Sequence, residues 1–418
     1  MGVESKENKL FLQALKAALE DKKVQWEREI APEEWNMLFQ TAREHHVLPM
    51  IYEAVYTCAA ARSLSPELSL QMKRKTIQTV TMQTLKTDEF LKLYRHLEER
   101  EIHPLVVKGI VCRSLYPNPD YRISGDEDIL IPEAVFQKSH EAMLEFGMQQ
   151  AEPGQDVQSV YEVPYHRPGS LIYIEAHKYL FPPDSEAYGE LNGFFEGVWG
   201  RKNEIVIQGT RIWTLNSTDH LLYLICHAFK HFLHSGFGIR QVCDIILFAN
   251  EYGREVDWQL LLKHCREIRA EKFTAALFRI GWKYLTFDME KACYPPEWQD
   301  IVVNEKMLLE DLLGGGVYGG ATLSRKHSSN MTLHAVSAHK KGRKERFSLL
   351  TTVFPSAKSL EGRYTYLKKH PYLLPRAWAE RLLKYRKETK QNSDNQAADA
   401  MKIGSQRIEL LKQYGIIK

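Results

Sequence analysis

Apolar residues recur at two different spacings along the chain. Over residues 1–100 they fall three or four positions apart, as at Phe11 and Leu15, which predicts amphipathic helices. Residues 101–215 instead hold short apolar runs separated by turns, a pattern typical of strands interspersed with helices. Helical spacing returns over residues 216–388. The pattern predicts an α/β core with a helical domain on either side.

Proline and small polar residues mark where the N-terminal helices begin. Pro32 stands before a helix expected over about residues 33–45, whose acidic first turn suits the helix dipole. Ser65-Pro66-Glu67 opens a long helix that should run to about Glu99.

The C-terminal part contains two segments of loop or linker composition. The glycine-rich run over residues 314–320 lacks the Lys-Ser/Thr of a phosphate-binding P-loop and is expected to be a connector or flap. Residues 390–400 have linker composition, and residues 403–417 predict a final amphipathic helix. Residues 389–418 are therefore expected to be a linker and a terminal helix.

Four strands, two helices and a hairpin are expected within the α/β core. The strands are predicted over residues 103–107, 126–131, 156–161 and 171–177, and the helices over 109–116 and 132–146. The hairpin covers residues 205–213 and should turn at Gln208-Gly209.

Two carboxylates, Asp126 and Asp128, lie on one of these strands. Side chains alternate faces along a strand, so both should point the same way. Stability does not explain such a pair, because the two charges repel each other and burial penalises both. A divalent cation removes the conflict, and Mg²⁺ is usually held by one or two carboxylates together with substrate phosphates. Asp-x-Asp is also common in turns, but the apolar Ile129-Leu130-Ile131 that follows favours a strand entering a core.

A third acid lies on the last of the four predicted strands. Tyr173, Glu175 and His177 share one face of that strand. If it pairs beside the first strand, Glu175 joins Asp126 and Asp128 in one cluster, which can hold two metal ions in line with a transferring phosphate. An edge strand with a solvated Glu and His explains the pattern equally well.

These residues belong to a longer pattern that resembles a known family. In order, the pattern reads Lys108-Gly109, a helix, Tyr116-Pro117-Asn118-Pro119, Arg122, Ser124-Gly125 and Asp126-Glu127-Asp128. It is similar to the signature of the uncharacterised bacterial nucleotidyltransferase family within the DNA polymerase β-like superfamily. The likeness extends to Glu175-Ala176-His177, His227-x-x-Lys230-His231 and Arg240-x-x-x-Asp244, and more weakly over most of residues 30–385.

Two positions depart from that pattern. Position 127 is usually apolar in the family, whereas here it is Glu127, which should point away from the two aspartates. Ile110 follows Gly109 where superfamily members often place Ser, which weakens the case for a hydroxyl contact to phosphate.

The resemblance implies an α+β fold, with a small mixed β-sheet nucleotidyltransferase core flanked by N-terminal and C-terminal helical domains. It also implies that Asp126, Asp128 and Glu175 are the catalytic residues and hold Mg²⁺ or Mn²⁺. Lys108 and Gly109 would lie beside them at a strand-to-helix turn, where backbone N–H groups and an ammonium group attract the phosphates of a nucleoside triphosphate.

Three basic residues crowd one face of the helix predicted after Ser217. His227, Lys230 and His231 stand at i, i+3 and i+4. The resemblance implies that this face borders the active site, where Lys230 would contact the triphosphate and one histidine would contact the acceptor or a phosphate. A half-exposed polar stripe is the alternative.

Two arginines of the pattern have simpler expectations. Arg122 could bind a phosphate or steady its loop by pairing with Asp120. Arg240 and Asp244 are four residues apart on a predicted helix, so they should form an intrahelical ion pair worth about 0.5 kcal/mol.

The composition is that of an ordinary globular protein. Of 418 residues, 44% are hydrophobic and 26% are charged. The net charge of +3 gives no strong nucleic-acid signal. No apolar stretch is long enough for a bilayer, and the polar N-terminus does not resemble a signal peptide, so we expect a cytoplasmic protein without a membrane partner. The six cysteines are scattered, and several are expected to be reduced core residues.

Three functions fit these observations. The first is Mg-dependent transfer of an NMP from an NTP, ATP among them, to a hydroxyl of a small molecule, a peptide or RNA, with release of pyrophosphate. The second is a phosphotransferase that uses the same carboxylates, although the sequence motifs of kinases are absent. The third is a non-catalytic module that binds Mg-nucleotide, and the intact set of three acids argues against it.

Overall fold

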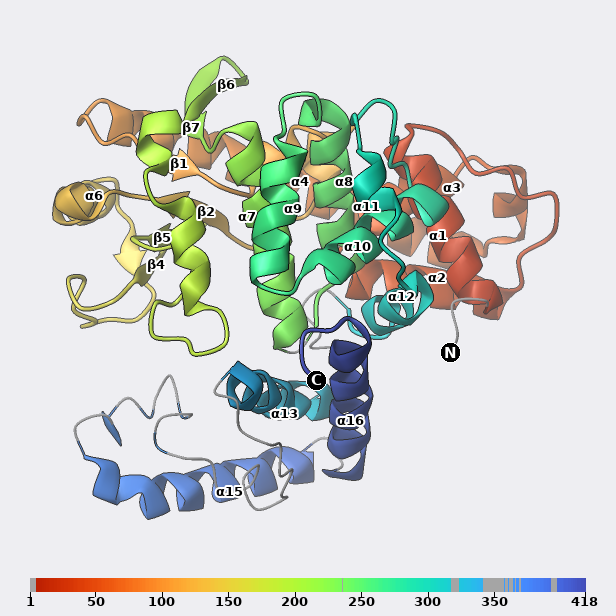
Figure 1. Cartoon of the computed structure of the whole chain (residues 1–418). Helices are drawn as coiled ribbons and strands as arrows, with labels where there is room; N and C mark the ends of the chain where they lie inside the picture. The colour runs from red at the N-terminus through yellow and green to blue at the C-terminus, as the bar shows by residue number, and fades with distance from the viewer. Residues whose placement is uncertain are drawn as a thin grey trace.

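The structure, a computed structural model, describes residues 5–234, 236–316, 323–340, 370–391 and 397–418, with a few residues between 357 and 367. Helices lie on both sides of one mixed seven-stranded sheet (Figure 1). The α+β fold with flanking helices is therefore confirmed. Most of the predicted glycine-rich connector, residues 317–320, lies outside the described residues.

The N-terminal region is helical, as its apolar spacing predicts. It contains α1 (Lys6–Leu19), α2 (Pro32–Glu44), α3 (Leu48–Val55) and α4 (Pro66–Glu98). α4 begins at its expected cap, where the Ser65 hydroxyl accepts the backbone N–H of Leu68. Phe90 and Tyr94, near the end of α4, pack in the core formed with the sheet, so this helix joins the N-terminal helices to the strands.

The sheet has the strand order β3-β4-β5-β2-β1-β7-β6. The strands are β1 (Leu105–Val106), β2 (Glu127–Leu130), β3 (Gln149–Gln150), β4 (Glu162–His166), β5 (Tyr173–His177), β6 (Asn203–Ile207) and β7 (Thr210–Thr214). β2 runs parallel to β5, and β1 runs parallel to β7, whereas the other neighbours are antiparallel. The two strands that carry the predicted acids are therefore adjacent.

The predicted hairpin is confirmed, and one predicted strand is wrong. Gln208 and Gly209 have φ values of 47° and 77°, as a tight two-residue turn between β6 and β7 requires. Residues 156–161 form no strand, because the Asp156 carboxylate accepts the backbone N–H of Gln158 at 3.0 Å and bends the chain. The strand begins at Glu162 instead.

Side-chain alternation divides the interior into two cores. Val106 and Ile129 pack with α4 and with α6 (Phe136–Glu145) on one face of the sheet. Leu105 and Leu130 face the other way and join a larger core that includes α7 (Ser217–Leu233) and α8 (Ile239–Tyr252). Asp128 alternates with Ile129 along β2, so it lies on the α7 side.

Further helices and 3₁₀ turns lie between these elements and after them. They are α5 (Ile110–Arg113), α9 (Trp258–Glu267), α10 (Glu271–Tyr284), α11 (Pro296–Gln299), α12 (Glu305–Leu313) and the 3₁₀ turns η1 (Ala59–Ser63), η2 (Pro119–Tyr121), η3 (Glu133–Val135), η4 (Gly189–Phe195), η5 (Val198–Arg201) and η8 (Pro371–Leu373).

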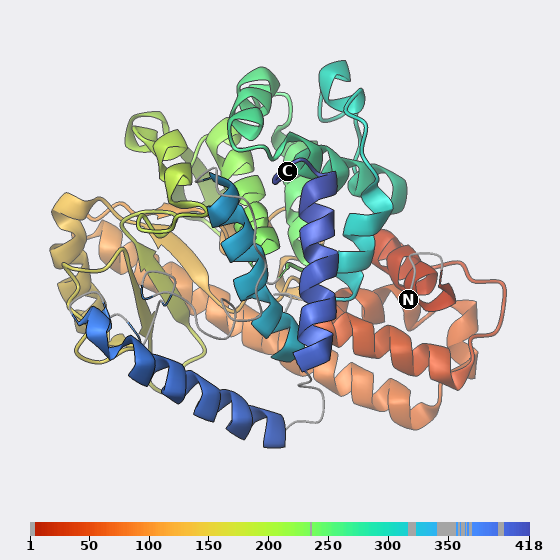
Figure 2. The same ribbon diagram turned by 60° about the horizontal axis from the view of Figure 1, so that its bottom comes forward.

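The last described helices are α13 (Leu323–Lys340), α15 (Leu374–Gln391) and α16 (Ala397–Gln413). α13 and α16 lie side by side (Figures 1 and 2). The Thr332 hydroxyl of α13 donates to the carbonyl of His234 at 2.9 Å, and Lys340 donates to the carbonyl of Ala187 at 2.6 Å. α13 therefore connects the end of α7 to the segment before η4.

The segment predicted as a linker, residues 390–400, is helical at both ends. Residues 390–391 belong to α15 and residues 397–400 belong to α16, whereas residues 392–396 lie outside the described residues. The terminal helix itself is present and packs through the buried Leu410 and Leu411.

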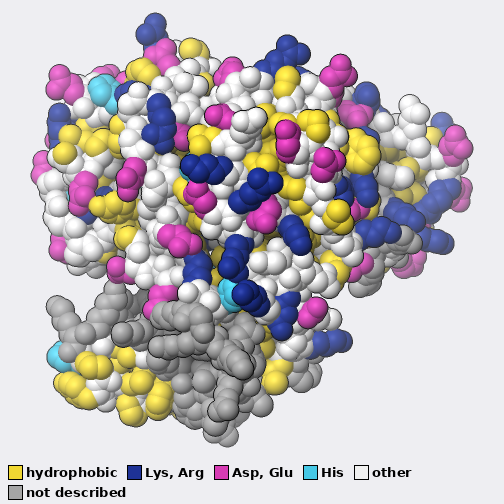
Figure 3. Space-filling view, viewed as in Figure 1, with side chains coloured by type: hydrophobic (Ala, Val, Ile, Leu, Met, Phe, Trp, Pro, Cys, Tyr) yellow, Lys and Arg dark blue, Asp and Glu magenta, His cyan; other side chains and the backbone are white. Residues whose placement is uncertain are grey.

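The thiols agree with the sequence expectation. All six cysteines are free, and five of them are buried. None of the helices in the described part of the chain combines the length and apolar character that crossing a membrane requires. Figure 3 shows Lys and Arg side chains mixed with Asp and Glu side chains over most of the described surface on that face.

Candidate metal and nucleotide site

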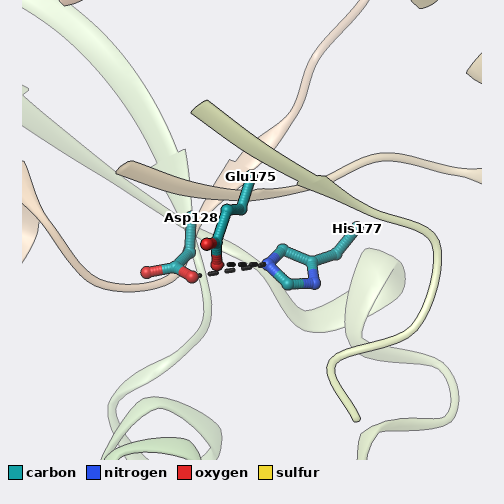
Figure 4. Close-up of side chains that lie close together, drawn as sticks. All are labelled: Asp128, Glu175 and His177. Atoms are coloured by element: carbon teal, nitrogen blue, oxygen red, sulfur yellow. Dashed lines mark hydrogen bonds and ion pairs between the residues drawn. The ribbon is translucent and has the colours of Figure 1, made fainter. Parts of the chain in front are cut away.

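The pairing of β2 with β5 brings two acids and a histidine together. Asp128 lies opposite Glu175, and Leu130 lies opposite His177. The ligand atoms of Asp128, Glu175 and His177 all lie within 4.8 Å of one another (Figure 4). His177 Nε2 is 3.3 Å from Asp128 Oδ1 and 3.8 Å from Glu175 Oε2. The strand pairing on which the expected cluster depends is therefore present.

Lys108 lies between Asp126 and this group of three residues. Asp126 lies one residue before β2 and is half-buried. Lys108 Nζ is 2.7 Å from Asp128 Oδ2 and 3.9 Å from Asp126 Oδ1. Asp126 does not belong to the compact group of three ligands, whose third member is His177.

The acids of the site differ in how readily they ionise. Burial, followed by the charges of Asp128 and Asp126, raises the pKa of Glu175 to about 9. Burial alone would raise the pKa of Asp128 too, but the Lys108 ammonium and His177 outweigh it and hold that pKa well below its usual value. At neutral pH the site therefore keeps one acid ionised and the other protonated.

These residues fit a divalent cation. Carboxylate oxygens suit Mg²⁺ and Mn²⁺, and an imidazole nitrogen suits transition metals. The high pKa of Glu175 reflects burial and then the neighbouring acids, and a cation beside Asp128 and Glu175 would offset both effects. Asp128, Glu175 and His177 would hold such an ion.

A glycine turn brings Lys108 to the aspartates. β1 ends at Val106, and α5 begins at Ile110. Gly109 has a φ of 52°, and a Cβ atom there would lie 1.8 Å from Glu127 Oε2, so no other residue fits this turn without displacing Glu127. Lys108 and Gly109 therefore lie at the strand-to-helix turn, as expected.

Glu127 points away from the site, as predicted. Its carboxylate accepts the backbone N–H of Ile110 at 2.7 Å and the Ser124 hydroxyl at 3.2 Å, and it forms an ion pair with Arg113. The acid that departs from the family pattern thus fixes the turn that carries Lys108.

Lys86 supports the same loop from α4, and sequence reasoning missed it. Its ammonium donates to the carbonyls of Ser124 at 3.1 Å and Gly125 at 2.6 Å, directly before Asp126. Burial lowers the pKa of Lys86. The only sequence signal would be a lysine on the buried face of an amphipathic helix.

The α7 face borders the site. His227 Nε2 lies 3.4 Å from Lys108 Nζ, and the rings of His227 and His231 are 4.6 Å apart. Burial lowers the pKa of His227 far below its usual value and that of His231 to about 3, so both rings are neutral. Lys230 lies 6.0 Å from the ring centre of Tyr188.

The two expected arginine pairs are wrong. Arg122 is almost fully buried and forms a two-pronged ion pair with Asp244, with distances of 2.7 and 2.6 Å. Asp120 instead accepts the Thr84 hydroxyl, and Arg240 donates to the carbonyl of Ile123. A planar guanidinium matches a carboxylate on both prongs, so the long-range pair replaces both local ones. The structure places Arg122 with Asp244 rather than with the residues around Asp128.

The small mixed sheet thus carries carboxylates on two adjacent strands and a lysine at the neighbouring turn. Residues 31–284, more than half of the chain, match the model of a family described as uncharacterised nucleotidyltransferase. The chain belongs to this family. No curated protein and no solved structure matches the chain.

Proposed function

We propose that this protein is a metal-dependent nucleotidyltransferase that transfers an NMP from an NTP to a hydroxyl-bearing acceptor and releases pyrophosphate. One observation carries the proposal, namely the parallel register that sets Asp128 opposite Glu175 with Lys108 2.7 Å from Asp128. Membership in the nucleotidyltransferase family supports the same chemistry.

The site's cations would bind the triphosphate. Lys108 stands at the β1–α5 turn beside the aspartates, and Lys230 lies on the α7 face that borders them. Four acids lie near these lysines, namely Asp126, Asp128, Glu162 and Glu175. The negative triphosphate of an NTP would therefore bind favourably only if a further positive charge offset these acids. A divalent ion supplies that offset and polarises the α-phosphate when bound.

The reaction is a single displacement at the α-phosphorus. The acceptor hydroxyl oxygen forms a bond to phosphorus, the bond to the β-phosphate oxygen breaks, and pyrophosphate leaves. Glu175 lies beside Asp128, and once a bound cation has displaced its proton, its carboxylate would hold the ion or take the proton of the acceptor hydroxyl. Positioning and electrostatics would supply most of the rate enhancement. His227 and His231, both neutral, would line the approach of the phosphates or the acceptor.

Labelled nucleotides test the proposal. The purified protein is incubated with Mg²⁺ or Mn²⁺, a cell extract and each NTP labelled at either the α- or the γ-phosphate. The Asp126→Asn/Asp128→Asn variant is the comparison, and Asp88→Asn on the exposed face of α4 is the matched control. Transfer of α-label only, lost in the double variant and kept in the control, is the expected result.

The other labelling patterns would replace the proposal. Transfer of γ-label only would identify a phosphotransferase that uses the same carboxylates. Binding of Mg-nucleotide without transfer of either label, in extracts that supply small molecules, peptides and RNA, would identify a non-catalytic nucleotide-binding module.

A further inference from the structure

A fourth acid stands behind the histidine of the site. Glu162 begins β4, and in the antiparallel pairing of β4 with β5 it lies directly opposite His177. Glu162 Oε2 is 3.5 Å from His177 Nδ1. Because the sequence pattern predicts a strand that ends before Glu162, this residue carried no functional expectation.

The imidazole of His177 is held between acids on both sides. Nε2 points toward Asp128 and Glu175, and Nδ1 points toward Glu162 (Figure 4 shows the first side). The ring is only 5% exposed, and its buried Nδ1 makes no hydrogen bond to any described residue. A shift of a few tenths of an ångström by the half-buried Glu162 would complete a hydrogen bond to Nδ1.

This arrangement matches the way proteins orient a metal-bound histidine. A ligating imidazole usually donates its second N–H to a carboxylate, which fixes the ring and its tautomer. When a cation lies between Asp128 and Glu175, a proton on Nδ1 facing Glu162 would leave the Nε2 lone pair of His177 toward that cation. The cation would attract this lone pair and offset the charge of the acids.

We propose that His177 Nε2 is a metal ligand together with Asp128 and Glu175, and that Glu162 is the positioning residue that orients it. The inference rests on the proposed function, since it concerns the same metal site. It also narrows the choice of metal. Mg²⁺ prefers oxygen ligands alone, whereas one imidazole nitrogen favours Mn²⁺ and the later transition metals over Mg²⁺.

Electron paramagnetic resonance with Mn²⁺ alone tests the assignment without any activity measurement. Loss of the free-ion signal gives the Kd, and pulsed spectra detect a nitrogen atom bound to Mn²⁺. The wild type should show nitrogen coupling, and His177→Gln should abolish it. Glu162→Gln should weaken Mn²⁺ binding about 10- to 100-fold, and Glu162→Asp should recover part of the loss.

Two matched controls keep the test specific. His166→Gln changes the histidine at the other end of β4, and Glu141→Gln changes an exposed acid on α6. Both should bind Mn²⁺ as the wild type does, and thermal unfolding should confirm that every variant folds. Mg²⁺ should displace Mn²⁺ less readily from the wild type than from His177→Gln.

Several outcomes would overturn the assignment. They are the absence of Mn²⁺ binding, the absence of nitrogen coupling in the wild type, coupling that persists in His177→Gln, and a Glu162→Gln affinity equal to that of the wild type. The assay also separates this inference from the proposed function. Nitrogen-bound Mn²⁺ without transfer of α-label would reject the function alone, whereas transfer without nitrogen coupling would reject the ligand assignment alone.

Discussion

The two faces of β2 carry adjacent acids, Glu127 and Asp128, whose surroundings differ in how far they compensate a negative charge. Glu127 and Asp128 are equally inaccessible, at 0% and 2% exposed. Glu127 lies among Arg113, a serine hydroxyl and a backbone N–H, which together satisfy its charge. Asp128 has Lys108 beside it but also faces Glu175, so negative charge accumulates on that face. Burial therefore does not distinguish the acid that stabilises a turn from the acid that we propose to bind a metal.

The balance of charge distinguishes the two faces. On the Glu127 side each buried cation meets an acid or a carbonyl, as Lys86 does at Ser124 and Gly125. On the Asp128 side, burial together with the charges of neighbouring acids raises the pKa of Glu175 to about 9. Perturbed acids in excess of their partners are typical of functional sites.

The largest expected effect comes from Glu175→Gln. Because Glu175 is mostly protonated at pH 7, a neutral glutamine of the same shape should leave the stability of the metal-free protein within about 0.5 kcal/mol of the wild type. Nucleotidyl transfer should fall about 10⁴-fold, since a carboxylate of the metal site is lost. Thermal unfolding and the α-label assay check the two halves. A large loss of stability would show that the acid is structural, like Glu127.

Glu127→Gln should show the reverse pattern. Removing one partner of the buried Glu127–Arg113 pair leaves Arg113 uncompensated and should cost about 3–5 kcal/mol of unfolding free energy. Denaturant unfolding measures this loss.

The double variant Glu127→Leu/Arg113→Met supplies the control for that prediction. Apolar residues of similar volume often replace a buried pair without loss, so stability should return to near the wild-type value. A double variant as unstable as Glu127→Gln would show that the acid is needed for the Gly109 turn itself, through its bond to the Ile110 N–H.

The stability of the protein should also depend on pH, through His220 on α7. This buried ring contacts the Thr214 hydroxyl at 3.0 Å, and burial lowers its pKa to about 4. In the unfolded chain the pKa of this histidine is about 6.5, so between pH 4 and 6.5 the unfolded state binds more protons than the folded state. The free energy of unfolding should therefore fall by at most about 3 kcal/mol as the pH drops through that range. Unfolding midpoints of His220→Gln should depend less on pH over that window. The exposed His103→Gln serves as control and should keep the wild-type slope.

The sequence predicted the acids on the Asp128 face better than it predicted the residues that hold those acids in place. Strand alternation placed Asp128 and Glu175 on faces that could meet, because a period of two is a local property. His177 shares that face, but the sequence predicted no role for it. Its contact with Asp128 depends on the register between β2 and β5, in which Glu127 pairs with Ile174, 47 residues later.

The missed residues are those whose partners lie far away in the chain. Arg122 meets Asp244, 122 residues further along, so the nearer acid at position 120 was the wrong choice. Glu162 was missed because the side chain of Asp156 turns the chain and delays the strand. Long-range pairs and side-chain capping of turns leave no periodic signal, so only the fold reveals them.

The smallest expected effect concerns Lys108 and would sharpen the comparison most. Burial alone would lower the pKa of its ammonium, but Asp126 and Asp128 raise it above its usual value, so Lys108 is the charge that now balances the site. It would therefore compete with a divalent cation for Asp128. Lys108→Ala should tighten Mn²⁺ binding about 10-fold, a change of about 1.4 kcal/mol, while transfer slows because the triphosphate loses a contact.

Lys230→Ala is the matched control, because Lys230 lies on α7 and is not paired with Asp128 in the way that Lys108 is. It should raise the KM for NTP and leave Mn²⁺ affinity nearly unchanged. Tighter Mn²⁺ binding together with slower transfer, in Lys108→Ala but not in Lys230→Ala, would support a change of partner at Lys108. Its ammonium would leave the Asp128 carboxylate and bind a phosphate when the substrate arrives. Weaker Mn²⁺ binding in Lys108→Ala would instead mean that Lys108 holds Asp128 in position for the ion, as Arg113 holds Glu127 for the turn.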